Sequence, residues 1–419
     1  MRILLALLAI GGWLAAAVDS RAASPVENWP GWRGPRGDGS SLEPSTPTRW
    51  NGLTGENIAW KVAVPGTGHA SPIVWGDHIF LVSARRETEQ RLLLAFDRRT
   101  GRSLWEQVVL ESPWERKHSL NSYASSTPAT DGELIYVSFL DRDSMFVAAY
   151  DFSGNRRWAV RPGPFASVHG YCSSPVLFQD LVIVNGDHDG DAYLVALDRR
   201  TGKTVWKTPR ENKTRSYCVP LIREIGGRTQ MILSGSKCVA SYDPHDGSRH
   251  WIIDGPTEQF VASLVYNGEL LFMTAGFPEF HILAIRPDGR GNVTNTHVAW
   301  RTDKGCAYVP SPIASQDGKY FLVASDKGIG SCLEARTGRR LWMERLGVHY
   351  SASLITAGGL VYFLADDGVT TVVRPGEKLD VVATNPLGED CRASAAVSRK
   401  QIFVRSDTHL FAIGRGVDP

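Results

Sequence analysis

The chain has 419 residues, and its 46 Lys and Arg nearly balance its 44 Asp and Glu, for a net charge of +2. This balance excludes a protein that binds nucleic acid through a strongly basic surface, and 42% hydrophobic against 21% charged residues excludes a mainly disordered chain. The 41 Gly, 23 Pro and 13 Trp, without a sustained apolar period of about 3.6 residues, favour an all-β fold with many turns.

Residues 1–22 are predicted to be a secretory signal peptide. Arg2 precedes an apolar run from Ile3 to Val18, and the small residue Ala22 suits cleavage. The run is short for a membrane span, and no Cys directly follows it to take a lipid. We therefore expect a secreted or periplasmic protein with no integral membrane segment after cleavage.

Residues 23–55 form a leader that is rich in Gly, Pro, Arg and Trp and carries no strand period. We expect this leader to pack on the domain that follows it. Two roles remain open: a packing tail in which Trp29 and Trp32 fill a groove, or a lid that covers one opening of the domain.

A repeat of roughly 40 to 50 residues then runs through the chain, marked by a Gly and a Trp four positions later. In most copies an Asp closes the strand before the Gly. Asp bonds the turn backbone and Gly supplies the positive φ of a tight reversal, so each copy predicts a β-hairpin. The structural repeat residues are Asp97, Gly101 and Trp105; Gly154 and Trp158; Asp198, Gly202 and Trp206; Gly247 and Trp251; Gly338 and Trp342; and Trp300 in a divergent copy.

Two further strand-like runs precede each hairpin, which gives four strands per repeat, as in one blade of a β-propeller. The Trp spacing predicts six blades between Trp60 and Trp342, and two more follow. The last blade lacks a fourth strand, which the strand around Trp60 supplies, so N- and C-terminal strands pair and close the ring. We therefore predict a single domain over residues 56–419: a monomeric, eight-bladed β-propeller of four-stranded antiparallel blades, with seven blades as the alternative.

The repeat resembles the A-x-D-x-x-T-G-x-x-x-W motif of the pyrroloquinoline quinone (PQQ)-binding-like β-propeller family. Ala95 to Trp105 and Ala196 to Trp206 match it fully, and Cys332 to Trp342 matches with Cys and Glu in place of Ala and Asp. The segment from Trp29 to Gly39 also resembles a leader of exported bacterial members. This resemblance implies the propeller fold, because the motif itself is structural.

The family that the chain resembles contains quinoprotein dehydrogenases, which hold PQQ and calcium over the channel, and scaffolds of outer-membrane assembly, which bind no cofactor. The dehydrogenases have a vicinal disulfide, and this chain has no adjacent cysteines. Its blades are also short. These departures favour an exported module that binds a ligand or a protein partner, not an enzyme. Two alternatives stay open: a PQQ-dependent alcohol or sugar dehydrogenase, with Arg215 and Arg392 on the quinone carboxylates, and a carbohydrate-binding propeller.

The connections that precede the innermost strands converge on one mouth of the predicted channel. Aromatic, His and Arg side chains there would bind an anionic or planar ligand, although a wet mouth is polar in any case. The candidate ligand-binding residues are His69, Tyr123, His169, Tyr171, Arg215, Tyr217, Gln259, Tyr308, His349, Tyr350 and Arg392, beside Cys172, Cys218 and Cys391.

Cys172 and Cys218 fall one alignment position apart in neighbouring blades, which makes them candidates for a disulfide. The acidic run from Asp187 to Asp191 lacks the spacing of a calcium loop and recurs as a turn in other repeats, so we predict no metal site. Asp390 is the one acidic candidate at the mouth for a calcium ion beside PQQ. No nucleotide-binding loop or catalytic-serine motif is present in the sequence.

Overall fold

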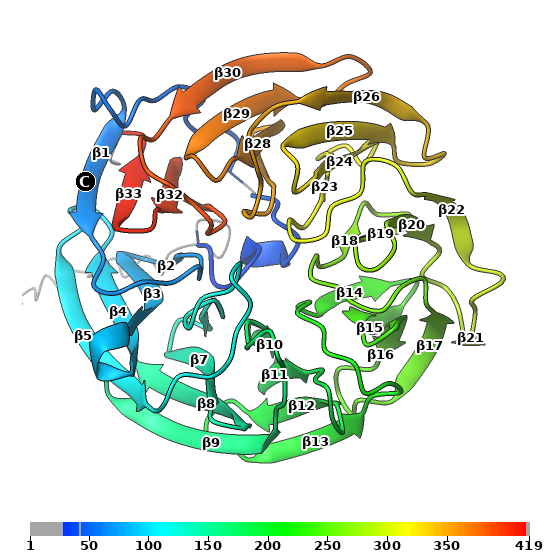
Figure 1. Ribbon diagram of the computed structural model, residues 1–419, viewed down its shortest axis with the longest axis horizontal. Coiled ribbons are helices and arrows are strands. Elements are labelled where there is room, and N and C mark those ends of the chain that lie inside the picture. The colour runs from blue at the N-terminus through cyan, green and yellow to red at the C-terminus, as the bar shows by residue number, and fades with distance from the viewer. Residues whose placement is uncertain (1–27, 42, 416–419) are drawn as a thin grey trace, which may run out of the picture.

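The computed structural model describes residues 28–41 and 43–415. The predicted signal peptide, residues 1–22, lies outside these residues. The described chain forms eight antiparallel β-sheets arranged as a ring (Figure 1). The prediction of an eight-bladed propeller is therefore confirmed, and the seven-bladed alternative is wrong. No helix in the described part of the chain is long and apolar enough to span a bilayer.

Each blade runs from an inner strand at the channel to an outer strand at the rim. Blade I has β2 (Ile73–Trp75), β3 (His78–Arg85), β4 (Gln90–Asp97) and β5 (Ser103–Glu111). Blade II has β6 (Ala129–Thr130), β7 (Leu134–Asp141), β8 (Ser144–Asp151) and β9 (Arg156–Pro164). Blade III has β10 (Val176–Phe178), β11 (Leu181–Gly186), β12 (Tyr193–Asp198) and β13 (Thr204–Pro209). Blade IV has β14 (Leu221–Ile225), β15 (Arg228–Gly235), β16 (Cys238–Tyr242) and β17 (Arg249–Asp254).

The second half of the ring repeats this order. Blade V has β18 (Val265–Tyr266), β19 (Leu271–Ala275), β20 (His281–Ile285) and β22 (Val298–Thr302). Blade VI has β23 (Ile313–Ala314), β24 (Tyr320–Ala324), β25 (Ile329–Glu334) and β26 (Arg340–Arg345). Blade VII has β27 (Ile355–Ala357), β28 (Leu360–Leu364), β29 (Val369–Arg374) and β30 (Asp380–Pro386). Blade VIII has β31 (Ala396–Ser398), β32 (Gln401–Arg405), β33 (His409–Ile413) and, from the other end of the domain, β1 (Ile58–Ala63).

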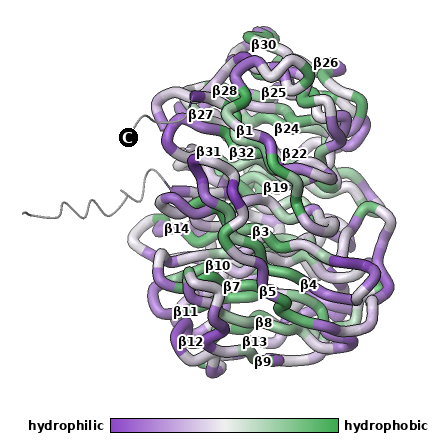
Figure 2. Tube along the Cα trace, turned by 90° about the vertical axis from the view of Figure 1, so that its left-hand side faces the viewer, coloured by the Kyte–Doolittle hydropathy of each residue, from purple (hydrophilic) through white to green (hydrophobic). Residues whose placement is uncertain are grey.

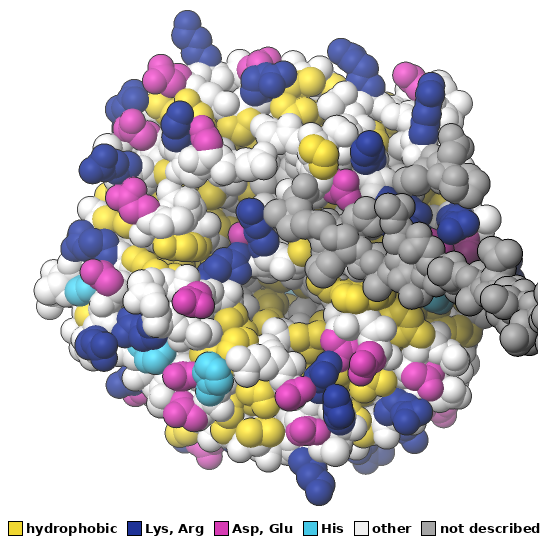
Figure 3. Space-filling view, turned by 180° about the vertical axis from the view of Figure 1, so that it is seen from behind, with side chains coloured by type: hydrophobic (Ala, Val, Ile, Leu, Met, Phe, Trp, Pro, Cys, Tyr) yellow, Lys and Arg dark blue, Asp and Glu magenta, His cyan; other side chains and the backbone are white. Residues whose placement is uncertain are grey.

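The ring closes as predicted, because β1 forms the outer strand of blade VIII. It pairs antiparallel with β33, from Ile58 opposite Ile413 to Ala63 opposite His409. The middle strands of the blades are buried on both faces, whereas the loops at the two faces of the disc are largely hydrophilic (Figure 2). On the face shown in Figure 3, Lys and Arg side chains are interspersed with Asp and Glu side chains, in keeping with the balanced net charge.

The repeat Trp of one blade packs on the repeat Gly of the next. Trp158 Nε1 donates a hydrogen bond to the carbonyl oxygen of Arg199 at 2.9 Å, and a methyl group on Gly202 would lie 2.6 Å from the Trp158 ring. Gly is therefore required there both for its φ of 71° and for the space that it leaves. Equivalent indole hydrogen bonds come from Trp60, Trp105, Trp206, Trp300 and Trp342.

Trp251 departs from this arrangement. Its indole donates within its own blade, to Gln230 Oε1 at 2.8 Å. The reason is the long turn of blade V, which carries no repeat Gly and instead places β21 (Gly291–Asn292) parallel to β17, with Gly291 opposite Trp251.

A belt of hydroxyl groups links the inner ends of most neighbouring blades. At each link a backbone N–H donates to a Ser or Thr hydroxyl one blade further on, at 2.9 to 3.0 Å. Because each of these hydroxyls accepts a main-chain hydrogen bond, its position at the channel wall is fixed. The accepting side chains are Thr127, Ser174, Ser263, Ser311, Ser353 and Ser394.

The leader crosses the ring and reaches its axis. Trp29 forms a β-bridge with Val74 of blade I, and Ser40 forms one with Thr356 of blade VII. Between them the short 3-10 helix η2 (Gly34–Arg36) lies near the centre of the ring (Figure 1). The leader therefore packs on blades and places η2 near the axis of the ring.

Candidate functional site

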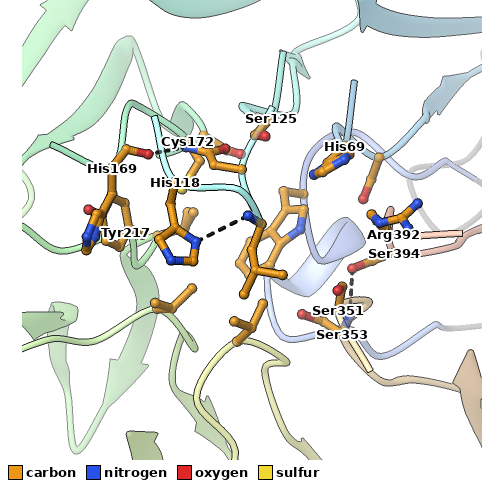
Figure 4. Close-up of a pocket in the computed structure, with 18 of the residues that line it drawn as sticks. His69, His118, Ser125, His169, Cys172, Tyr217, Ser351, Ser353, Arg392 and Ser394 are labelled. Atoms are coloured by element: carbon orange, nitrogen blue, oxygen red, sulfur yellow. Dashed lines mark hydrogen bonds between the residues drawn. The ribbon is translucent and has the colours of Figure 1, made fainter. Parts of the chain in front are cut away.

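The connections from each outer strand to the next inner strand meet around the axis and enclose a cavity of about 200 Å³. Side chains from most of the blades and from the leader line it (Figure 4). The walls combine the hydroxyls of Ser71, Ser174, Ser353 and Ser394 with the apolar side chains of valines 219, 261 and 309. The cavity therefore offers hydrogen bonds along one part of its wall and apolar contact along another.

The leader supplies an aromatic side chain to the cavity, Trp32. The next residue, Arg33, is 2% exposed and donates hydrogen bonds to the carbonyl oxygens of Leu354, Asp38 and Pro312. These bonds satisfy the buried guanidinium and tie the leader to blades VI and VII. Trp32 is thereby held in place by its neighbour.

The longest connection between two blades, residues 112–128, brings His118, Leu120 and Asn121 to the cavity. It is anchored by the fully buried Arg91, which pairs with Glu115 at 2.5 Å and lies 4.2 Å from the Trp114 ring. An insertion held in this way is a fixed wall and not a loose flap.

Two of the histidines of the cavity, His69 and His169, favour the neutral imidazole. Burial lowers the pKa of His69 to about 4, and the cations Arg405 and Arg392 add to this effect. Burial, together with Arg215 and His118, also lowers the pKa of His169. The His118 and His169 rings meet edge to face with their centroids 5.2 Å apart. Neutral imidazoles both donate and accept hydrogen bonds, so they suit an uncharged polar ligand.

The one Arg of the cavity wall is already paired. Arg392 lies 2.5 Å from Asp407 and 3.6 Å from Asp390. Among the residues that the structure describes, no Asp or Glu lines this cavity. The site therefore presents little net charge to a ligand.

A family model described as outer membrane protein assembly factor BamB matches residues 48–159, 89–276 and 290–412. The chain belongs to this family. The predicted resemblance to the PQQ-binding-like propellers is thus confirmed at the level of family. A search of curated proteins finds no significant match to this BamB-family chain.

Solved structures share the fold of this BamB-family propeller. BamB from Moraxella catarrhalis matches with a TM-score of 0.60 at 14% identity, over 86% of this chain and 98% of that one. A europium-containing methanol dehydrogenase matches with a TM-score of 0.60 at 13% identity, over 91% and 90%. The quinohemoprotein alcohol dehydrogenase from Comamonas testosteroni matches with a TM-score of 0.55 at 13% identity, over 95% and 82%. At these identities the likeness establishes the fold alone.

The residues of this BamB-family cavity do not fit PQQ with calcium. Calcium takes several oxygen ligands, mostly carboxylates, and no carboxylate of a described residue lines the cavity. No group of three or more His, Cys, Asp or Glu within the described ranges is arranged to hold a metal ion. The quinone carboxylates would meet Arg392, which Asp407 already occupies, while Arg215 lies outside the lining and pairs with Asp189.

The structure brings part of the predicted mouth together. His69, His169, Tyr217, Tyr308 and Arg392 line the cavity, as does Cys172.

The other predicted mouth residues have different positions. Tyr171 is buried between blades and donates to Ser138 Oγ, and Tyr350 is fully buried against Phe363. They face the core because Tyr171 packs on Phe165 beside β7, and Tyr350 packs on Phe363 of β28. Tyr123 stacks on Trp114 with centroids 4.2 Å apart, Gln259 accepts from the Tyr308 hydroxyl, and His349 pairs with Asp366.

Sequence reasoning missed Trp32, His118, Leu120 and Asn121 as lining residues. The signal for the last three was the excess length of the connection before the second blade. Alignment of the blades on their inner strands could not place an insertion that has no counterpart in the other repeats. Trp32 is noted in the leader, for which both a packing tail and a lid are left open, but it is not among the candidate ligand-binding residues.

The predicted disulfide between Cys172 and Cys218 is not formed, because both residues are free thiols in the structure. Cys218 Sγ donates to the carbonyl oxygen of Ala262 at 3.2 Å and is fully buried. Burial raises the pKa of both thiols to about 12, so neither is a reactive thiolate.

The acidic run after β11 serves ion pairs. Asp187 is fully buried and lies 2.7 Å from Arg210, while Ser216 donates to its second oxygen. Asp189 pairs with Arg215 at 2.8 Å. These pairs fasten the connection between blades III and IV beside the cavity.

Proposed function

We propose that this BamB-family propeller is an exported, non-enzymatic binding module, and that its channel cavity takes an uncharged ligand with a compact polar ring, such as a neutral sugar. A single observation carries the proposal: the cavity joins an aromatic side chain, hydroxyls and neutral imidazoles, with Arg392 paired and no described carboxylate in the wall. Export is proposed from the N-terminal segment, and a monomer from the closed ring.

The rigidity of the site supports a binding role. The hydroxyls of Ser174, Ser353 and Ser394 accept main-chain hydrogen bonds and keep their protons for donation to another group. Trp32 is held by the leader, and aromatic rings stack on the apolar faces of sugar rings. A preformed site of this kind loses little entropy on binding.

The family description, an outer membrane protein assembly factor, names a role in assembling other proteins. We propose that loops at the faces of the disc are available for contact with a protein partner, while the cavity serves a small molecule. The two uses do not exclude each other, because the cavity lies within the channel.

The test is a titration of the purified mature protein, followed by calorimetry, with methyl β-D-glucopyranoside and with PQQ plus calcium. We expect saturable glucoside binding that Trp32→Leu weakens at least tenfold, because Leu keeps apolar bulk but offers no ring. Leu53→Ser, at a position 73% exposed on the leader, should leave binding unchanged. PQQ should give no heat.

Two results would overturn the proposal. Micromolar or tighter PQQ binding that Arg392→Ala abolishes would establish the quinoprotein alternative. Equal glucoside affinity in Trp32→Leu and in the parent protein would show that the glucoside does not bind in the cavity.

A further inference from the structure

A second hollow, of about 460 Å³, opens beside the cavity over blades V and VI. Leu120, Phe280 and Met343 line it and are 48%, 45% and 42% exposed, and Ile329 adds to its wall. Exposure of several large apolar side chains to water is unfavourable, and such a patch is typical of a surface that binds a ligand or a partner. We call this hollow the apolar groove.

The apolar groove adjoins the channel cavity. Leu120 and Tyr308 line both hollows. Tyr308 is fixed between them: its hydroxyl donates to Gln259 Oε1 at 3.1 Å, and its Cβ packs on Gly276, where an added methyl group would lie 2.6 Å away. The two hollows therefore share a wall formed by Leu120 and Tyr308, and a ligand long enough to pass these side chains would contact both.

The charged groups along the groove are balanced. Asp326 accepts hydrogen bonds from the backbone N–H groups of Tyr308 and Val309 and is followed in sequence by Lys327. Asp303 lies 3.4 Å from Lys304. Charges of both signs thus lie along the groove, and Arg392 of the cavity is paired with Asp407, so complementarity favours a neutral molecule.

We infer that the joined site binds an uncharged amphiphile, with a polar ring head in the channel cavity and an aliphatic chain along the apolar groove. This inference rests on the proposed function, since the head occupies the cavity argued for above. Each methylene that leaves water against Leu120, Phe280 and Met343 adds to the affinity. Binding of the aliphatic chain in the groove can therefore be tested separately from binding of the polar head in the cavity.

The experiment compares two probes of identical head: methyl β-D-glucopyranoside and octyl β-D-glucopyranoside, the latter below its critical micelle concentration. Calorimetry on the full mature chain should give at least tenfold tighter binding for the octyl compound. Phe280→Ser and Met343→Ser should each reduce that gain several-fold and leave the methyl compound unaffected. Val205→Ser, at a strand position 54% exposed on blade III, is the matched control and should change neither.

The outcomes separate the two claims. The inference is overturned if both glucosides bind with equal affinity, or if the tighter binding of the octyl compound is kept in both groove variants. In either case, binding of the methyl compound that Trp32→Leu weakens would still support the proposed function. Absence of binding by both glucosides overturns both. Octanoate, which has a similar chain but a charged head, should bind more weakly than the octyl glucoside, and tighter octanoate binding contradicts the uncharged head.

Discussion

At the scale of single residues, the repeat is a device for joining blades. The Gly turn admits the Trp of the preceding blade because it has no Cβ, and the indole N–H finds a carbonyl in that turn. This contact explains why Gly and Trp recur together in the sequence: the Gly turn of one copy leaves space and a carbonyl group for the Trp of the preceding copy. Where the turn changes, as in blade V, the indole of Trp251 finds a different partner.

Gly202→Ala should lower the free energy of unfolding by roughly 2 to 4 kcal/mol, because the new methyl group meets Trp158 and the positive φ is strained. Gly226→Ala is the matched control, since Gly226 also has a positive φ but open space around it. It should cost only about 1 kcal/mol. Urea denaturation followed by Trp fluorescence measures both, and equal losses would show that the contact with Trp158 contributes nothing.

At the scale of elements, two segments distant in sequence complete the ring. The leader reaches the axis and is tied there by Arg33. Blade VIII is completed by β1, and Glu389, in the connection before β31, fastens it. Glu389 pairs with Lys61 of β1 at 2.5 Å and accepts hydrogen bonds from Ser406 and Thr408 beside β33.

The Glu389 carboxylate should make the protein sensitive to acid. Burial acts to raise its pKa, but hydrogen bonds from Lys61, Ser406, Thr408 and His409 outweigh burial and lower the pKa to about 2. A carboxyl whose pKa is lower in the folded state stabilises above its unfolded pKa, about 4.5, and loses that stabilisation as the pH falls toward 2.

Glu389→Gln should therefore be less stable than the parent by roughly 2 to 3 kcal/mol at pH 7, and this difference should shrink as the pH falls from about 4.5 toward 2. Glu377→Gln, at an exposed position of blade VII, is the control and should follow the parent. Denaturation midpoints measured from pH 2.5 to 7 test this. A constant difference over the whole range would mean that the loss comes from packing and not from the charge.

At the scale of the whole molecule, ring closure removes the free edge that eight sheets in a row would leave. The strand β33 lies between β32 and β1, so its backbone groups are paired on both sides. Without β1, one side of β33 becomes an open edge able to pair with another chain. Closure also fixes the position of the cavity, because its walls come from blades at opposite ends of the sequence.

A chain that begins at Pro65 should self-associate and melt at least 10 °C below a chain that begins at Glu56, in which β1 is kept. Both lack the leader, so the comparison isolates the strand. Size-exclusion chromatography with light scattering and thermal denaturation provide the measurement. Two monomeric chains of equal melting temperature would show that β1 is dispensable for closure.

The sequence by itself determined the blades. Strand alternation, the Gly turn and the Trp four positions later depend on local chemistry, which recurs in each copy, and the missing fourth strand of the last blade implied its partner around Trp60. The converging connections also placed His69, His169, Tyr217, Tyr308 and Arg392 near one mouth, because the position of an inner strand fixes where its connection begins.

Tertiary structure alone decided the character of the site. Whether a tyrosine of the mouth faces the channel, as Tyr217 does, or the core, as Tyr350 does, depends on the side chains that pack around it, such as Phe363 beside Tyr350. The neutral state of His69 depends on its burial beside two arginines. Trp32 reaches the cavity because Arg33 donates hydrogen bonds to the carbonyl oxygens of Leu354 and Pro312, which are more distant along the chain than any repeat. Local chemistry specifies strands and turns. The side chains that line the channel are positioned by contacts between segments that do not occupy equivalent positions in the repeat.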